Sequence, residues 1–169
     1  ALLELLFENV WHARPRFVPG DAEVKDVVDD NASDADARLV IGDAALVLGS
    51  NHRERYPFVY DLGQMWKNWT AQPFVFAVWV AQRSTNVKEA LLAHAGLIAS
   101  RDWGLRHLSE LAEQAHEATG VERSVCAEYL SGLDYGLSYP HLAGLTEFYR
   151  RLVERGRIPN GTLTFLPAA

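Results

Sequence analysis

Short apolar runs mark much of the chain, and each leads into a polar turn or the start of a helix. Runs of this kind, rich in Val, Ile and Phe, are typical of buried strands. The run at 74–81 is continuously apolar, which predicts a central strand covered on both faces. The segments that we expect to be strands are 16–18, 39–41, 58–62, 74–81 and 162–166.

Between these runs, apolar residues recur at every third or fourth position, which is the spacing of a helix with one buried face. Asp61 and Ser138 are expected to cap helices at their N-termini, and Gln64 should complete a capping box with Asp61. Gly120 and Gly156 are expected to end helices. The expected helices are 1–11, 21–30, 43–48, a segment after Asp61 that carries Met65, Trp66 and Trp69, 87–98, 105–118, 121–130 and 138–155.

This order of elements predicts an α/β fold. Strands alternate with helices up to about residue 85, as in βαβ units around a mainly parallel sheet, and helices dominate afterwards. A boundary between two parts is expected on the long strand, at 74–84. The chain opens inside a helix at Ala1, without a capping residue, so we interpret it as the C-terminal part of a longer protein.

Composition and charge indicate which partners the protein is not expected to bind. The chain has a net charge of −6, 49% hydrophobic residues and 22% charged residues, which is typical of a soluble globular protein. The densest basic group is Arg150, Arg151, Arg155 and Arg157, at the end of a predicted helix, where cations interact favourably with the helix dipole. Nucleic acid is therefore not an expected partner. The longest apolar run is also too short to cross a bilayer, so no membrane association is expected.

The sequence contains no pattern of cofactor chemistry. Cys126 is the only cysteine, so no disulfide can form within the chain, and its helical surroundings predict a small core residue. The six histidines are scattered without metal-ligand spacing. The chain also lacks a P-loop, a dinucleotide-binding fingerprint and a nucleophile elbow. We therefore predict neither a metal site nor a nucleotide cofactor.

Gly42 and Asp43 are the first candidates for ligand binding. They follow a predicted strand and open a predicted helix, where free N–H groups can meet an anion. The Asp43 carboxylate can also contact a ligand hydroxyl. The alternative for Asp43 is a plain N-cap, and the same two interpretations apply to Asp61.

Phe76 and Trp79 are the second candidates. They belong to an aromatic-rich set that can wall a pocket for a planar or cyclic ligand. Core packing is the alternative for most of this set, with Phe76 or Trp79 left at a pocket edge. The other members are Trp66, Trp69 and Phe74.

Several motifs carry a resemblance to a known family. They are Leu39-Val-Ile-Gly-Asp-Ala-Ala-Leu46, Tyr60-Asp-Leu-Gly-x-x-Trp66, Pro73-Phe-Val-Phe-Ala-Val-Trp79, Arg16-Phe-Val-Pro19, Tyr129-Leu130, Leu133-Asp-Tyr135 and Leu145-x-x-Phe-Tyr149 ahead of Ile158-Pro159. In combination they resemble the chorismate dehydratase family of menaquinone biosynthesis by the futalosine route. The resemblance covers nearly the whole chain.

The resemblance implies a two-lobed α/β scaffold like that of type II periplasmic binding proteins, with the ligand in the cleft between the lobes. Residues 1–75 would form the middle, second lobe. Residues 76–169 would supply the returning crossover strand and the helical part of the first lobe, whose opening strands would lie upstream of Ala1.

The resemblance also implies a cytoplasmic lyase that removes water from chorismate, a dicarboxylate, and gives 3-[(1-carboxyvinyl)oxy]benzoate without a cofactor. The family's carboxylate-binding segment and proposed catalytic groups would precede residue 1, so no catalytic residue is assigned in this chain. Gly42, Asp43, Phe76 and Trp79 are the residues that we expect to bind substrate.

Two alternatives remain open. A sibling enzyme, 1,4-dihydroxy-6-naphthoate synthase, shares the scaffold but has Ile-His-Glu where this chain has Ile41-Gly42-Asp43, and that histidine is its proposed base. Since a glycine has no side chain for proton transfer, this position favours the dehydratase. The other alternative is a solute-binding or sensor domain on the same scaffold, without catalysis.

Overall fold

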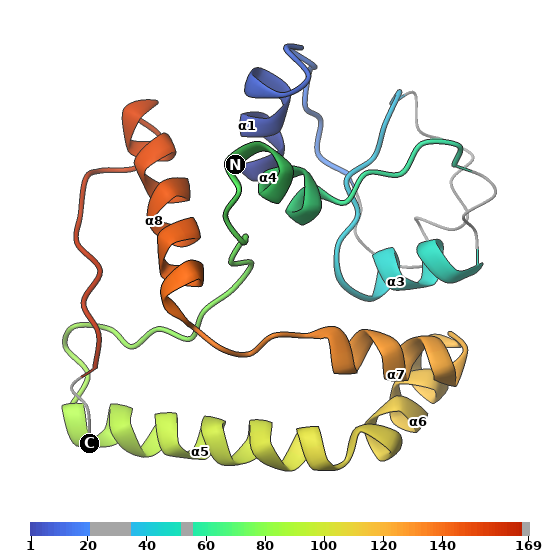
Figure 1. The fold of residues 1–169 in the computed structure, drawn as a ribbon, viewed down its shortest axis with the longest axis vertical. Helices are drawn as coiled ribbons and strands as arrows, with labels where there is room; N and C mark the ends of the chain where they lie inside the picture. The colour runs from blue at the N-terminus through green and yellow to red at the C-terminus, as the bar shows by residue number, and fades with distance from the viewer. Residues whose placement is uncertain (21–34, 52–55, 167–169) are drawn as a thin grey trace. The chain divides into compact units, whose positions relative to one another are not determined.

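The computed structural model describes residues 1–20, 35–51 and 56–166, and within these ranges the regular structure is helical (Figure 1). The predicted helix at 21–30 and most of the predicted turn at 31–36 lie outside the described residues. The helices are α1 (Leu2–Asn9), α3 (Gly42–Asn51), α4 (Leu62–Thr70), α5 (Val87–Arg106), α6 (Leu108–Thr119), α7 (Arg123–Gly132) and α8 (Tyr139–Glu154).

Most of these helices lie where the apolar spacing predicts them, which confirms those helix predictions. The largest difference in a boundary is at α5, which continues past the predicted end at residue 98 as far as Arg106. Gly104 lies inside this extension, and a single glycine costs a helix only about 1 kcal/mol. The break falls instead at His107, whose carbonyl oxygen accepts the first hydrogen bond of α6, from Leu111 N–H at 3.1 Å.

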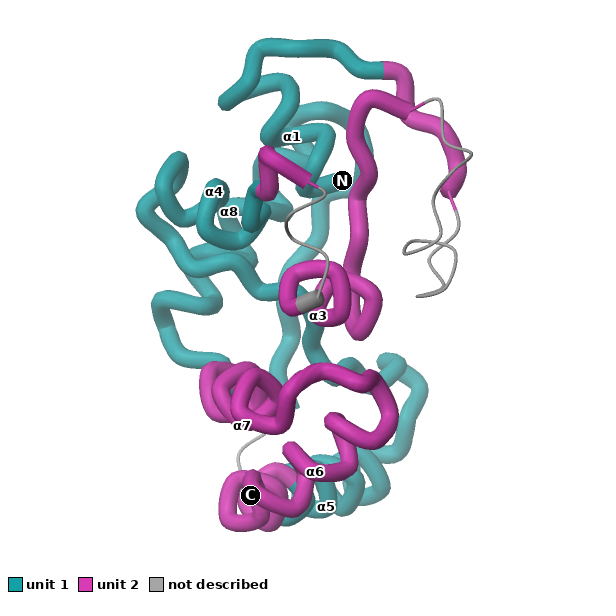
Figure 2. Tube along the Cα trace, turned by 90° about the vertical axis from the view of Figure 1, so that its right-hand side faces the viewer, with its two compact units in different colours: residues 1–15, 60–100, 135–169 teal, residues 16–59, 101–134 magenta. Residues whose placement is uncertain are grey.

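The chain divides into two compact units (Figure 2). Unit 1 comprises residues 1–15, 60–100 and 135–169, and unit 2 comprises residues 16–59 and 101–134. Helices α1, α4 and α8 therefore belong to unit 1, and α3, α6 and α7 to unit 2, whereas α5 contributes to both. The predicted lobe boundary near residue 75 stays a prediction.

The core of unit 1 is built around Trp66, which is fully buried on α4. Leu5 of α1 and Leu152 of α8 complete the buried cluster. Three aromatic rings meet Trp66 edge-on, with centroid separations of 5.5 to 5.8 Å, which is a favourable geometry for aromatic pairs. They belong to Trp69, Phe74 and Phe148. For Trp66, core packing is therefore the confirmed interpretation.

The core of unit 2 joins α3, α6 and α7. Val47, Ala112, Val121 and Cys126 form its buried cluster. Cys126 is fully buried with a free thiol, which confirms the prediction of a small core residue. Gly120 follows α6 in the left-handed conformation, with φ of +71°, which confirms it as the residue that ends the helix.

Both predicted N-caps begin a helix. The Asp61 carboxylate accepts a hydrogen bond from Gln64 N–H at 2.9 Å, which satisfies one of the free donors of α4. The reciprocal half of the predicted capping box is wrong, because the Gln64 side chain donates to Asn68 instead, at 2.8 Å. At α8, the Ser138 N–H donates to His141 Nδ1 at 3.2 Å, and Pro140 occupies the first turn.

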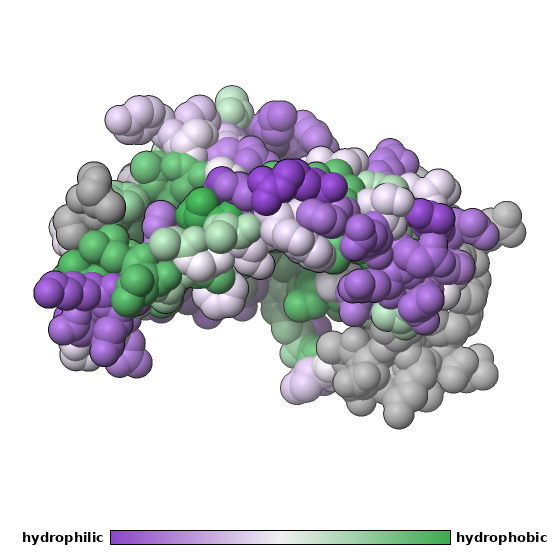
Figure 3. Space-filling view, turned by 90° about the horizontal axis from the view of Figure 1, so that it is seen from below, coloured by the Kyte–Doolittle hydropathy of each residue, from purple (hydrophilic) through white to green (hydrophobic). Residues whose placement is uncertain are grey.

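The strand predictions are wrong for the described residues. No strand occurs in residues 1–20, 35–51 or 56–166, and the segments 16–18, 39–41, 58–61, 74–81 and 162–166 are irregular chain. A strand exists only where its backbone pairs with a neighbouring strand, and no backbone hydrogen bonds join these segments to one another in the described part of the chain. Many of their large side chains are exposed, and hydrophobic residues stand at the surface in Figure 3. The described residues are helical and do not match the predicted α/β scaffold, which the structure therefore does not confirm.

Candidate functional site

Gly42 and Asp43 lie at the start of α3, in unit 2. Gly42 has φ of +63°, a left-handed conformation that a residue with a side chain rarely adopts, and both residues are exposed. Asp43 lies in the first turn of the helix, where a carboxylate interacts favourably with the helix dipole. The predicted helix start is confirmed here, whereas the predicted role in ligand binding stays a prediction.

Phe76 and Trp79 lie in unit 1, on the irregular segment after α4, and are 75% and 84% exposed. The Phe76 ring contacts Phe74, with centroids 4.9 Å apart, and covers the first turn of α4 at Gly63. A Cβ atom on Gly63 would lie 2.8 Å from Phe76 Cζ and 3.3 Å from Asp61 Oδ1. The ring therefore lies beside the capped N-terminus of α4. Its proposed contact with a ligand stays a prediction.

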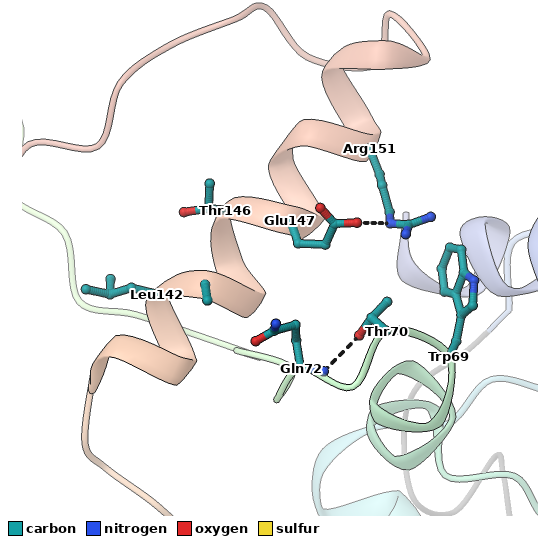
Figure 4. Close-up of a pocket in the computed structure, with 8 residues that line it drawn as sticks. Trp69, Thr70, Gln72, Leu142, Thr146, Glu147 and Arg151 are labelled. Atoms are coloured by element: carbon teal, nitrogen blue, oxygen red, sulfur yellow. Dashed lines mark hydrogen bonds and ion pairs between the residues drawn. The ribbon is translucent and has the colours of Figure 1, made fainter.

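A separate pocket of about 520 Å³ lies in unit 1, between the end of α4 and one face of α8 (Figure 4). At its floor, Thr70 Oγ1 donates to the Trp66 carbonyl at 2.8 Å and accepts from Gln72 N–H at 3.2 Å. These bonds fix the turn that follows α4. The lining residues are Trp69, Thr70, Gln72, Leu142, Ala143, Thr146, Glu147 and Arg151.

Arg151 is the positively charged residue of this pocket. Its guanidinium carbon lies 3.9 Å from the centre of the Trp69 ring, a close cation–π contact. Its Nε donates to Glu147 Oε1 at 2.7 Å, one helical turn away on α8. Figure 4 shows the guanidinium held between this carboxylate and the indole. The side chain is 20% exposed, so it is fixed while part of it still faces solvent.

The Glu147 carboxylate accepts hydrogen bonds from two arginines. Arg150 forms a forked pair with both of its oxygens, at 2.7 Å each, in addition to the bond from Arg151. The hydrogen bond from Arg150 is the main cause that lowers the pKa of Glu147 below its ordinary value, against the opposing effect of partial burial. The same pair raises the pKa of Arg150, which also contacts Glu154. Glu147 and Arg150 are therefore both charged at neutral pH.

The described residues were also searched for a metal-ion site and for a membrane-spanning helix. Among the described residues, no group of three or more His, Cys, Asp or Glu side chains is placed to hold a metal ion. In the same part of the chain, no helix combines the length and apolar character needed to cross a membrane.

The sequence was also compared with known proteins. Residues 1–154 match the profile of a protein family described as menaquinone biosynthesis. The chain belongs to the menaquinone biosynthesis family. It is also 36% identical over 94 residues to the chorismate dehydratase of Thermus thermophilus. That match spans 56% of this chain and only 34% of the relative's length.

Membership of the menaquinone biosynthesis family confirms the resemblance that the motifs suggested. All four residues expected to bind substrate lie within the matched range. The structure places Gly42 and Asp43 together in unit 2, and Phe76 and Trp79 together in unit 1. Sequence reasoning missed the pocket at Arg151, which it grouped with the cations of a helix end. The signal that could have found it was the spacing of Glu147 and Arg151, which places opposite charges one turn apart on a helix.

Proposed function

We propose that this member of the menaquinone biosynthesis family dehydrates chorismate to 3-[(1-carboxyvinyl)oxy]benzoate. The similarity to the Thermus thermophilus chorismate dehydratase carries the proposal. The reaction removes a ring proton and a hydroxyl group as water, and formation of the aromatic ring drives it. No electrons are gained or lost overall, so the proposed chemistry requires no redox cofactor.

The substrate has two carboxylates and a ring. We propose that one set of residues binds a carboxylate and another set contacts the ring. At the start of α3, N–H groups that the helix does not use can donate to a carboxylate, with Asp43 available to a substrate hydroxyl. Phe76 and Trp79 offer exposed aromatic surface against the ring. The proposal assigns no catalytic base to this chain. It includes the two-lobed scaffold, with residues 1–75 in the second lobe and 76–169 returning to the first.

The glycine at residue 42 distinguishes this proposal from the sibling reaction. A 1,4-dihydroxy-6-naphthoate synthase is expected to have a histidine at that position as its base. Gly42 has no side chain and so cannot supply that base. The residue at this position therefore supports the dehydratase rather than the synthase.

The test is an activity assay of the full-length protein with chorismate, without added metal or nucleotide. Products are separated by chromatography, and we expect the carboxyvinyloxy-benzoate to form. Asp43→Asn should lower the rate at least tenfold, because it removes the carboxylate proposed to meet the substrate hydroxyl. Asp36→Asn is the matched control, since Asp36 is also an exposed aspartate of unit 2.

Two outcomes would contradict different parts of the proposal. Folded protein that binds chorismate and returns it unchanged would be a non-catalytic binding or sensor protein. Equal losses of rate in Asp43→Asn and Asp36→Asn would remove the assigned role of Asp43 while leaving the reaction in place.

A further inference from the structure

We propose that Gly63 is a positioning residue for Phe76. The absence of a side chain at residue 63 lets the Phe76 ring lie across the first turn of α4, in the orientation in which it meets the substrate ring. This inference rests on the proposed function, because Phe76 contacts chorismate only under that proposal. Gly63 belongs to one of the motifs of the family resemblance, but nothing in the sequence gives it a role.

The close approach of Phe76 to residue 63 is the first support. A Cβ atom on Gly63 would lie 2.8 Å from Phe76 Cζ and 3.1 Å from Phe76 Cε2. Two carbon atoms that are not bonded to each other ordinarily stay about 3.5 to 4.0 Å apart. Any side chain at residue 63 would therefore displace the ring from its present place.

The backbone at Gly63 gives no other reason for a glycine. Gly63 lies in the first turn of α4, and the glycines with a positive φ in the described part of the chain are Gly42, Gly120 and Gly156. Alanine is the best helix former and glycine one of the poorest, so a glycine here weakens the helix. The space that the Phe76 ring occupies accounts for it.

Phe74 holds the Phe76 ring from the side of the core. Phe74 meets the buried Trp66 edge-on, with centroids 5.5 Å apart, and Phe148 at 5.1 Å. The Phe76 ring packs on Phe74 in turn, at 4.9 Å and an interplanar angle of 75°, yet Phe76 is 75% exposed. The ring is therefore held by two contacts and still offers most of its surface to a ligand. A ring fixed in this way loses less freedom when a ligand binds.

Gly63→Ala should move the Phe76 ring and leave the fold intact. The obstacle to the new methyl group is the outer end of an exposed side chain, which can turn away. The melting temperature should therefore not fall. The KM for chorismate should rise about three- to tenfold while kcat stays within about twofold, as expected when a contact made equally by bound substrate and transition state is lost.

Gly96→Ala is the matched control. Gly96 is also a helical glycine of unit 1, and a methyl group added there would meet nothing within 4 Å. This change should leave both KM and kcat as they are in the unchanged protein.

A second background separates the ring from the cap of α4. The new Cβ atom would also lie 3.3 Å from Asp61 Oδ1, so a disturbed cap is the competing explanation for a change in KM. Phe76→Leu removes the ring carbons that the methyl group would meet. In that background Gly63→Ala should raise the KM no further, whereas an effect through the cap would raise it again by the same factor.

The contact itself is measured without substrate, by NMR of the full-length protein with labelled phenylalanine. The ring signals of Phe76 are assigned with Phe76→Leu, and we expect a nuclear Overhauser effect between these protons and Gly63 Hα. Gly63→Ala should shift the Phe76 ring signals. The indole N–H of Trp103, in unit 2, is the internal reference and should not move.

Three results would overturn the inference while the protein still converts chorismate. They are the absence of the nuclear Overhauser effect, an unchanged KM in Gly63→Ala, and a second rise of the KM in the Phe76→Leu background. A folded protein that does not convert chorismate is a different result. It would overturn the proposed function and, with it, the substrate contact of Phe76 on which the role of Gly63 depends.

Discussion

Gly144 of α8 lies directly against the carbonyl of Pro73. A Cβ atom on Gly144 would overlap the Pro73 oxygen and lie 3.1 Å from the carbonyl carbon. The obstacle is backbone, which cannot rotate away as a side chain can. The absence of a side chain at residue 144 therefore allows α8 to approach the segment after α4, and this contact brings together the two walls of the Arg151 pocket.

Gly144→Ala should destabilise unit 1 by about 1 to 3 kcal/mol, the usual cost of forcing extra atoms into a packed contact. Gly96→Ala is the matched control, since Gly96 lies in the exposed part of α5 and a methyl group added there would meet nothing within 4 Å. That change should instead stabilise the helix, by up to about 1 kcal/mol. Denaturant unfolding of both variants measures the difference, and equal effects would contradict the close approach at Pro73.

Glu147 should make stability fall in acid. Its pKa is lowered in the folded protein from an ordinary value of 4.5, so the unfolded chain binds the proton more readily. The stabilising effect is fully present above that ordinary value and is lost as the pH falls through the lower pKa of the folded state. Glu147→Gln should remove this part of the pH dependence, at a cost of about 1 kcal/mol at neutral pH.

The measurement for Glu147 is the free energy of unfolding at a series of pH values from neutral to acid. Glu117→Gln, at an exposed position of α6, is the matched control for the loss of one surface carboxylate. A slope that Glu147→Gln does not alter would show that its ion pairs with Arg150 and Arg151 do not contribute to stability.

Asp61 should act as a helix cap that any short polar acceptor can replace. Asp61→Ala removes the acceptor of the Gln64 N–H and should cost about 1 kcal/mol. Asp61→Ser keeps an oxygen at the cap and should retain most of the stability. The melting temperatures of the two variants test whether Asp61 caps the helix. An activity assay tests the second interpretation, in which Asp61 contacts the ligand. A stable but inactive Asp61→Ser protein would show that Asp61 is a ligand contact as well as a cap.

Trp66 and Trp79 should respond to substitution in opposite ways. Trp66 is fully buried among three aromatic rings, so Trp66→Ala should cost about 3 to 5 kcal/mol. Trp79 is 84% exposed, so Trp79→Ser should change stability by no more than about 0.5 kcal/mol. If Trp79 contacts substrate as proposed, Trp79→Ser should still raise the KM for chorismate severalfold. A stable variant with unchanged KM would remove Trp79 from the proposed site.

Most helices, and several of their ends, follow from the order of residues alone. Apolar spacing located α4, α7 and α8, because the hydrogen bonds of a helix join residues only four positions apart. The same local character explains the correct prediction of Asp61 as a cap and of Gly120 as a stop. The apolar pattern around Cys126 was enough to place it in a core, since one face of a helix must be covered.

The remaining segments take their roles from contacts between distant parts of the chain. Apolar runs such as 74–81 have the composition of strands, but a strand requires a partner from another part of the chain, and composition does not name that partner. The pocket has the same dependence on distant segments. Trp69 and Arg151 are 82 positions apart in the sequence, and only the close approach of α8 to the end of α4 stacks one on the other.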